Sequence, residues 1–503
     1  MKYNLIWINL LSLVFCVVFL YGFKSAVHKG KQTPNILLIV SEDNGPDLGC
    51  YGNENVHTPV LDQLAESGVR FDNAYVTYSV CSPSRSTLFT GLYPHQNGQI
   101  GLATHKYRMF KDFTSLPEYL KEKGYRTACL GKLHVNPESA IPFDYREIKG
   151  SNFAKRGLER YAAKAKDFVE QSDDPFFLMV NFPDAHFPVQ KRVEGRPTKI
   201  VEPDELETSL PFVGLTSERL KDYTANYYNC MNRLDESVGM LLDELKSIKA
   251  LENTVIIYLG DHGAQFSRGK CSNYEGALKV PMMISWPDVI KPDQNRTELI
   301  SSIDIVPTIL DIANVDKPAE LPGYSFIPLC TSEHYQQRDY LFADGAGATP
   351  RMYFPRRSVR GERYKLIHNL LRRENPHVAF YEKQKGHFEA GTSSETVQNA
   401  DSIWKNVYAT WKNPPKYELY DLQNDSLETV NLADDGSYIA ELNRLKKALV
   451  NWQNQTNDPL ADDRRLKLLS NEMDSIATAY PDLGYRKKKG FEWQYPYYLI
   501  DLK

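Results

Sequence analysis

Apolar runs of strand length alternate with segments of helical period through the first two thirds of the chain. Continuous runs of this kind are typical of strands buried on both faces of a sheet. They occur at 34–40, 126–130, 176–182, 254–259 and 280–285, and an alternating run at 69–80 predicts a further strand. Helices are predicted at 58–68, 116–123, 158–170, 217–246 and 305–312. The alternation predicts an α/β fold with a largely parallel sheet between layers of helices.

After about residue 350 the pattern changes to shorter, alternating strands and one long amphipathic helix. Hairpin strands are predicted at 357–369 and 417–422, and a helix at 438–455. The tail at 490–503 is rich in Trp, Tyr and Phe and is expected to pack back on the body. We therefore expect a main domain at 33–350 and a smaller α+β subdomain at 351–503.

The N-terminal segment 1–32 has the pattern of a targeting signal. An apolar stretch at 5–23 is followed by Lys24, Lys29 and Lys31. The stretch is almost long enough to span a bilayer, so a retained anchor is the alternative. Positive residues that follow the stretch disfavour an anchor with a cytoplasmic N-terminus, and we favour a cleaved signal peptide. The protein is then exported to a periplasmic, secreted or lysosome-like compartment, without stable membrane insertion.

The overall charge argues against a nucleic-acid partner. The formal net charge is −4 over 503 residues, so the chain creates no broad positive field. An anionic ligand must therefore be bound by local Lys, Arg and His side chains or by a metal. The six cysteines beyond the signal segment show no spacing typical of a metal site or a disulfide framework.

Polar side chains follow the predicted strands where each strand ends. Glu42 and Asp43 follow the first strand, and Asp261 and His262 follow the run at 254–259. Ligands of open α/β sheets bind outside the carboxyl ends of the strands. Two acid-containing pairs there favour one hard cation with oxygen ligands, and we favour Ca²⁺. His262 is the weaker ligand, because imidazole is a poorer partner for Ca²⁺ than an oxygen.

Further candidates follow the other strands: Lys132 and His134 after 126–130, and His186 after 176–182. The pentapeptide Cys81-Ser-Pro-Ser-Arg85 follows the run at 69–80 and precedes a predicted helix. It matches Cys-x-Pro-x-Arg, the pattern in which type I sulfatases have their cysteine oxidised to formylglycine. A buried structural cysteine is the alternative for the motif alone.

Other motifs extend the likeness, so that the chain resembles the type I sulfatases over nearly its whole length beyond the signal segment. They are Asn35-Ile36-Leu37-Leu38-Ile39, Gly49-Cys50-Tyr51-Gly52, Thr58-Pro59, Thr90-Gly91, Gly260-Asp261-His262-Gly263 and Val280-Pro281. Within that family the chain is most similar to the sulfamidase (heparan N-sulfatase) branch. Runs that carry this likeness include His95-Gln96-Asn97-Gly98, Leu366-Ile367-His368-Asn369-Leu370 and Glu418-Leu419-Tyr420-Asp421.

The resemblance implies an alkaline-phosphatase-like sulfatase sandwich, with a large mostly parallel sheet between helices and a C-terminal α+β subdomain with an antiparallel sheet. It implies that Cys81 becomes formylglycine, whose hydrate is the nucleophile and touches the ion. Arg85 would hold that hydrate. The metal ligands would be Glu42, Asp43, Cys81, Asp261 and His262. Lys132 and His134 would face the sulfate, with His134 also as the base that collapses the covalent intermediate. His186 would protonate the leaving group, and Lys270 would contact a sulfate oxygen or share the acid role.

Three residues depart from the pattern of the family; Glu42 and His262 shift the geometry of the metal site, and Lys270 bears on substrate preference. Glu42 replaces the usual Asp, His262 a frequent Asn, and Lys270 the Arg of the sulfamidase branch. A lysine offers a point charge where an arginine offers a bidentate fork.

By analogy, a C-terminal loop borders the pocket, so Arg356 or Arg357 could meet a uronate or a second sulfate. A solvated strand face is the alternative for each arginine. His105 and Tyr107 are weaker candidates for substrate contact, because packing explains either residue equally well.

We therefore expect a sulfatase that hydrolyses the sulfate esters or N-sulfates of a sulfated saccharide, with one Ca²⁺ and a formylglycine-generating enzyme as partner. Two alternatives stay open. One is a phosphomonoesterase or phosphodiesterase of the same superfamily. The other is a non-catalytic glycan-binding protein in which Cys81 is unmodified. The sequence leaves the oligomeric state open, a homodimer included.

Overall fold

A mostly parallel sheet of eight strands forms the centre of the computed structural model, which describes residues 33–110, 113–150 and 157–501. The strand order is β5-β4-β6-β1-β7-β8-β2-β9, and β8 is antiparallel to both of its neighbours. The strands are β1 (Asn35–Ser41), β2 (Val69–Phe71), β4 (Arg126–Gly131), β5 (Tyr145–Glu147), β6 (Phe176–Phe182), β7 (Thr254–Gly260), β8 (Met282–Ser285) and β9 (Gln294–Arg296). The predicted signal peptide at 1–32 lies outside the described residues.

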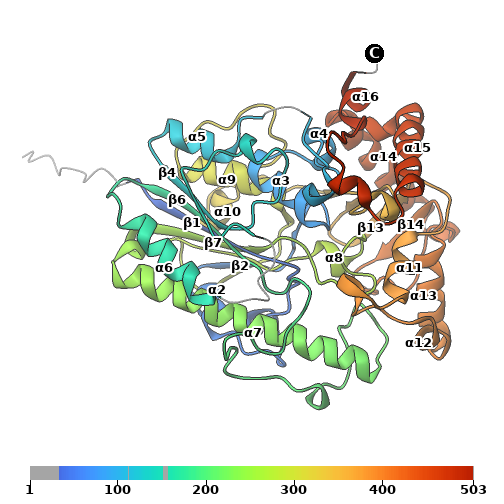
Figure 1. Cartoon of the computed structure of the whole chain (residues 1–503), viewed down its shortest axis with the longest axis horizontal. Helices are drawn as coiled ribbons and strands as arrows, with labels where there is room; N and C mark the ends of the chain where they lie inside the picture. The colour runs from blue at the N-terminus through green and yellow to red at the C-terminus, as the bar shows by residue number, and fades with distance from the viewer. Residues whose placement is uncertain (1–32, 111–112, 151–156, 502–503) are drawn as a thin grey trace, which may run out of the picture. The chain divides into compact units, whose positions relative to one another are not determined.

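Helices cover both faces of this sheet, as the sequence pattern predicts (Figure 1). One face packs against α2 (Pro59–Glu66), α6 (Leu158–Val169) and α7 (Glu218–Ser247). The other packs against α3 (Cys81–Thr90), α5 (Leu116–Glu122), α9 (Ile305–Ile312) and α10 (Ile327–Thr331). Successive residues of a strand point to opposite faces, so Leu37 of β1 enters one core while Leu38 enters the other. This explains why the central strands are apolar without alternation.

The predicted strand at 69–80 is wrong in its extent. The turn at Asp72 and Asn73 separates β2 from β3 (Ala74–Tyr75), and β3 pairs with β10 (Ile300–Ser301) in a separate two-stranded sheet. Asp and Asn favour turns because their side chains compete for backbone hydrogen bonds. The residues from Val76 to Val80 then lead to α3 without further strand structure.

A four-stranded antiparallel sheet lies in the C-terminal part, and it confirms the predicted hairpin strands. Its strands, in spatial order, are β11 (Leu341–Gly345), β12 (Arg356–Arg360), β13 (Tyr364–Asn369) and β14 (Tyr417–Asp421). The predicted helix is α14 (Ile439–Gln455), whose leucines pack against this sheet. Since β11 begins at Leu341, this sheet starts before residue 350, and the domain boundary there stays a prediction. The remaining helices are α4 (Pro94–Asn97), α8 (Glu275–Leu278), α11 (Pro376–Glu382), α12 (Ser394–Gln398), α13 (Ser402–Lys412), α15 (Asp463–Ala479) and α16 (Tyr495–Asp501).

The aromatic tail packs back on the body, as expected. Trp493 is 1% exposed, its ring stacks on Tyr107 with centroids 4.6 Å apart, and its indole N–H donates to the backbone oxygen of His105 at 3.1 Å. Tyr495 is fully buried beside them. These contacts bring the chain end next to residues near 105. In the part of the chain that the structure describes, no helix has the length and apolar character needed to cross a membrane.

Candidate active site

The predicted site residues meet at the carboxyl edge of the large sheet. Strands β4, β6, β1 and β7 are consecutive neighbours and run parallel, so the residues that follow them share one edge. The backbone N–H of Asp43, after β1, donates to Asp261 Oδ1, after β7, at 3.0 Å. The side chains of Glu42, Asp43, Asp261 and His262 are all fully buried. Three buried carboxylates in one place need compensating positive charge.

Cys81 is the first residue of α3 and faces this cluster. Its Sγ lies 3.4 Å from Nε2 of His262. Every residue of α3 is buried, which is unusual for a helix that carries five hydroxyl groups and an arginine. Burial raises the pKa of the Cys81 thiol, but the positive charges of Lys132 and Lys270 outweigh burial and leave this pKa well below its usual range. The helix also directs unsatisfied backbone N–H groups toward its N-terminus, where an anion is favoured.

Arg85, one turn along α3, holds the acidic cluster together. Its guanidinium is fully buried and donates to Glu42 Oε1 at 2.9 Å and to Asp261 Oδ2 at 3.2 Å. A third bond reaches Asn181 Oδ1 at 2.5 Å. In this structure Arg85 therefore contacts the carboxylates directly, and the hydrate contact that the resemblance implies stays a prediction. Removing one partner from such a buried network typically costs about 3–5 kcal/mol.

Two lysines supply further positive charge between the carboxylates and open space. Lys132 Nζ lies 2.5 Å from Glu42 Oε1. Lys270 Nζ lies 2.8 Å and 3.1 Å from the two oxygens of Asp43, and it also donates to Gln265 at 3.3 Å. Both lysines are less than 8% exposed, so their charges act in a medium of low dielectric constant.

The acidic cluster fits a hard cation. Oε2 of Glu42 is buried and has no hydrogen-bond partner among the described residues. Ligand atoms of Asp43, Cys81 and His262 lie within 4.8 Å of one another, as do those of Glu42, Cys81 and Asp261. His262 directs Nδ1 to the backbone oxygen of Gly263 at 3.0 Å, which leaves Nε2 facing the cluster. Carboxylate oxygens are the ligands that Ca²⁺ prefers.

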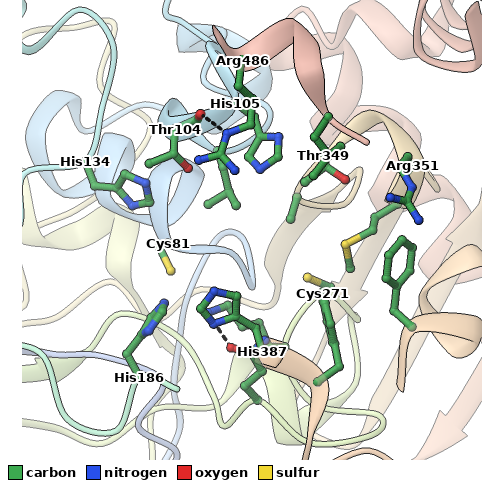
Figure 2. A pocket seen from close by; sticks show the side chains of 18 of the residues that line it. Cys81, Thr104, His105, His134, His186, Cys271, Thr349, Arg351, His387 and Arg486 are labelled. Atoms are coloured by element: carbon green, nitrogen blue, oxygen red, sulfur yellow. Dashed lines mark hydrogen bonds between the residues drawn. The ribbon is translucent and has the colours of Figure 1, made fainter. Parts of the chain in front are cut away.

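Besides His262, three histidines face Cys81 from different segments (Figure 2). Both ring nitrogens of His134 are buried without a hydrogen-bond partner among the described residues. Burial and the positive charge of the neighbouring Lys132 together lower the pKa of His134 to about 4. His186 directs Nδ1 to the backbone oxygen of Phe187 at 2.8 Å. Burial lowers the pKa of His186, but the hydrogen bond to Cys81 and the charges of Asp43 and Glu42 together outweigh burial and raise this pKa. His387, from the C-terminal part, lies edge-to-face on His186 with centroids 5.5 Å apart.

These groups line a cavity of about 370 Å³ whose walls come from both ends of the chain (Figure 2). The predicted residues Cys81, His105, Lys132, His134, His186 and Lys270 line it. Four polar or charged residues that the sequence did not predict also line the cavity: Gln265, Arg351, His387 and Arg486. These four lie outside the strand ends and carry no motif, so no local signal marks them.

The structure corrects the expectation for Arg356 and Arg357, because neither residue lines the cavity. Arg357 is 2% exposed and pairs with Asp458 at 2.7 Å and Asp344 at 3.2 Å. Arg356 is buried over the ring of Phe354. Both belong to β12, an inner strand covered on both faces, whereas the sequence pattern indicated a strand with a free face.

His105 and Tyr107 differ in their positions. His105 lines the cavity, but its Nδ1 is bonded to the hydroxyl of Tyr485 at 2.6 Å, and burial lowers its pKa to about 3. Tyr107 lies outside the cavity lining and packs on Trp493. His105 therefore contributes an uncharged ring to the wall, and Tyr107 serves packing.

This edge of the sheet places a potential nucleophile beside enough positive charge to hold an anionic ester. The large sheet with helices on both faces has an alkaline-phosphatase-like fold, which solved structures share. A putative sulfatase from Bacteroides fragilis shares the fold with a TM-score of 0.66 at 23% identity, covering 87% of this chain and 99% of its own. A structure of BT4656 in complex with its substrate D-glucosamine-2-N,6-O-disulfate has a TM-score of 0.63 at 20% identity, covering 85% and 99%.

The chain belongs to the sulfatase family, a class of sulfuric ester hydrolases. The family model for sulfatases matches residues 34–315, and the model for the C-terminal part of N-sulphoglucosamine sulphohydrolase matches residues 260–400. Human N-sulphoglucosamine sulphohydrolase is 31% identical over 461 residues, covering 84% of this chain and 91% of its own length. An ulvan-active sulfatase from Formosa agariphila is 31% identical over 451 residues, covering 86% and 82%.

Proposed function

We propose that this protein removes an O- or N-linked sulfate from a sulfated saccharide, with Cys81 oxidised to formylglycine and one Ca²⁺ bound. The observation that carries the proposal is the position of Cys81. Cys81 is the first residue of α3, and on one side its Sγ lies within 4.8 Å of carboxylate oxygens. On the other side it borders a cavity lined by Lys132, His134 and His186.

A formylglycine hydrate at position 81 supplies an oxygen that attacks sulfur and a second hydroxyl whose ionisation expels the sulfate by restoring the aldehyde. The attack on sulfur places negative charge on the other sulfate oxygens, and Lys132 and Lys270, which line the cavity, would stabilise that charge. His134 has free ring nitrogens and a pKa of about 4, so it is neutral near pH 7 and able to accept the proton of a hydroxyl at position 81.

His186 is the proposed proton donor for the leaving oxygen or nitrogen. Its Nδ1 is held by the backbone oxygen of Phe187, so Nε2 is the nitrogen free to face the substrate. The imidazole of histidine titrates near neutral pH, in the range in which a proton donor works. The ion would be held by Glu42, Asp43, Asp261 and His262. When bound, Ca²⁺ would acidify the hydrate and neutralise charge on the sulfate.

The size and lining of the cavity support a saccharide substrate. About 370 Å³ suits one sugar ring with its sulfate rather than an extended chain, which favours action at a chain end. Relatives described as N-sulphoglucosamine sulphohydrolase and ulvan-active sulfatase point to the same class of substrate. The proposal further includes export and maturation by a formylglycine-generating enzyme.

Two measurements test this function. Mass spectrometry of the tryptic peptide 71–85, from protein made together with a maturation enzyme, should show an aldehyde in place of the Cys81 thiol. The same preparation should hydrolyse members of a panel of sulfated mono- and disaccharides that includes N-sulfoglucosamine, and Cys81→Ser should abolish turnover while the melting temperature is kept. Unmodified cysteine only, or turnover that survives in Cys81→Ser, would refute the proposed nucleophile. Hydrolysis of a phosphate monoester in preference to every sulfate would favour the phosphatase alternative.

A further inference from the structure

The charges that line the cavity fall into two groups with different surroundings. Lys132 and Lys270 lie next to Cys81 and are ion-paired with Glu42 and Asp43. Arg351 and Arg486 also line the cavity, but among the described residues each hydrogen-bonds a backbone oxygen and neither forms an ion pair with a carboxylate. None of the described residues that line the cavity is an aspartate or a glutamate. The outer wall therefore carries two positive charges that no acidic side chain of the lining balances.

Each of these arginines is held in place by neutral groups. Arg351, in the 3-10 turn Pro350–Met352, donates Nη1 to the backbone oxygen of Pro481 at 2.7 Å, and its guanidinium lies 5.1 Å from the ring centre of Phe380. Arg486, in the turn Gly484–Lys487, donates Nε to the backbone oxygen of Thr104 at 3.0 Å. Such anchors fix the position of a guanidinium while N–H groups remain for a ligand.

The positions of the arginines differ from that of the proposed sulfate site. Figure 2 shows Arg351 on the side of the cavity away from Cys81 and His134, with Arg486 between these two sides. A sulfate held at Cys81 by the two lysines would leave both arginines free. The positive charge at the outer wall is therefore available to another part of the same substrate.

We infer that Arg351 and Arg486 form a second anion subsite, which selects saccharides carrying a further anionic group beside the sulfate that is removed. This inference rests on the proposed function and deepens it. Guanidinium groups pair with both carboxylates and sulfates, so the second group is either a uronate carboxylate or another sulfate. Arg351 and Arg486 act here on specificity, through binding of the substrate, and have no part in the bond-breaking step.

Binding measurements without turnover test this subsite. Isothermal titration calorimetry on the full chain carrying Cys81→Ala, with Ca²⁺ in the buffer, compares three probes. They are N-sulfoglucosamine, glucosamine 2-N,6-O-disulfate, and N-sulfoglucosamine linked to a uronate. We expect one or both doubly anionic probes to bind about tenfold more tightly than the singly anionic probe. The arm that shows this preference identifies the second group as sulfate or carboxylate.

The ratio of the affinity for the preferred doubly anionic probe to that for N-sulfoglucosamine should fall toward one in Arg351→Gln and in Arg486→Gln. Arg351→Lys should retain part of this preference. Arg192→Gln is the matched control, because Arg192 is exposed, bonds one backbone oxygen and lies outside the cavity lining. Melting temperatures show that each variant folds, and Arg486→Gln tests the subsite even if loss of the Arg351–Pro481 bond loosens the tail.

The inference is overturned if neither doubly anionic probe binds more tightly than N-sulfoglucosamine. It is also overturned if the preference survives in the variant that combines Arg351→Gln with Arg486→Gln, or if Arg192→Gln removes the preference as well. Turnover by the matured wild-type enzyme is scored separately. A wild type that hydrolyses no sulfated sugar refutes the proposed function, whereas equal affinities for the three probes refute the subsite.

Discussion

Replacing Trp493 by alanine should detach the C-terminal tail from the body without unfolding the rest of the molecule. The indole is 1% exposed and lies between the rings of Tyr107 and Phe491, with centroids 4.6 Å and 5.1 Å away, and its N–H bonds the backbone oxygen of His105. Truncating a buried Trp costs about 4 kcal/mol. Since every 1.4 kcal/mol is a factor of ten, the opening equilibrium of the tail should shift roughly a thousandfold.

Hydrogen exchange followed by mass spectrometry measures this opening. The peptide 491–500 should lose roughly a thousandfold protection in Trp493→Ala, while a peptide from α7 keeps the protection that it has in the wild type. Tyr497→Ala is the control within the tail, because Tyr497 is 52% exposed and its truncation should change protection little. A change below tenfold in the tail, or equal losses in the tail and in α7, would show that Trp493 does not hold the tail as a separate unit.

Three further predictions concern the ion, the acid and a buried carboxyl. Excess EGTA should lower the melting temperature and added Ca²⁺ should restore it, since the ion binds only the folded state; an unchanged melting curve would exclude a bound ion. His186→Gln should lower turnover of a saccharide sulfate by about 10²–10⁴ but barely affect a nitrophenyl sulfate, whose leaving group needs no proton; equal losses would contradict the assignment. Burial raises the pKa of Asp235 to about 7, so its protonated form is favoured in the folded state. The stability that this raised pKa contributes is full below about pH 4 and is lost as the pH rises toward 7. Asp235→Asn should therefore flatten the plot of unfolding free energy, measured with urea, against pH over that range. Parallel plots for the wild type and the variant would refute this.

The inner half of the site could be predicted because its residues follow strands directly. Asp43 and Asp261 each come within two residues of the end of a strand, and parallel strands bring such ends together. Cys81 was marked by its motif, and the structure places it at the first position of α3. In each of these cases a local signal combined with one rule of sheet topology was sufficient.

The outer half could not be predicted, because it depends on contacts between distant segments. Arg486 and His387 lie in 3-10 turns with no hydrophobic period, and only the docking of the C-terminal part carries them to the cavity. Arg357 shows the opposite error. Alternation along β12 reveals two faces but not that both are covered, so an arginine held by Asp458 had the pattern of a solvent-facing one.

The docking of the tail also determines when the catalytic cavity becomes complete during folding. His105 and Tyr485, which bond across its wall, are 380 residues apart in the chain. Contacts of such separation form late, because the entropy of closing a long loop opposes them until the rest of the structure is in place. A nascent chain that ends before Leu483 would already contain Cys81, the acidic cluster and the inner cations, yet it would lack one wall of the cavity. A premature stop within the last twenty residues or so would therefore affect substrate binding before it affects the large sheet.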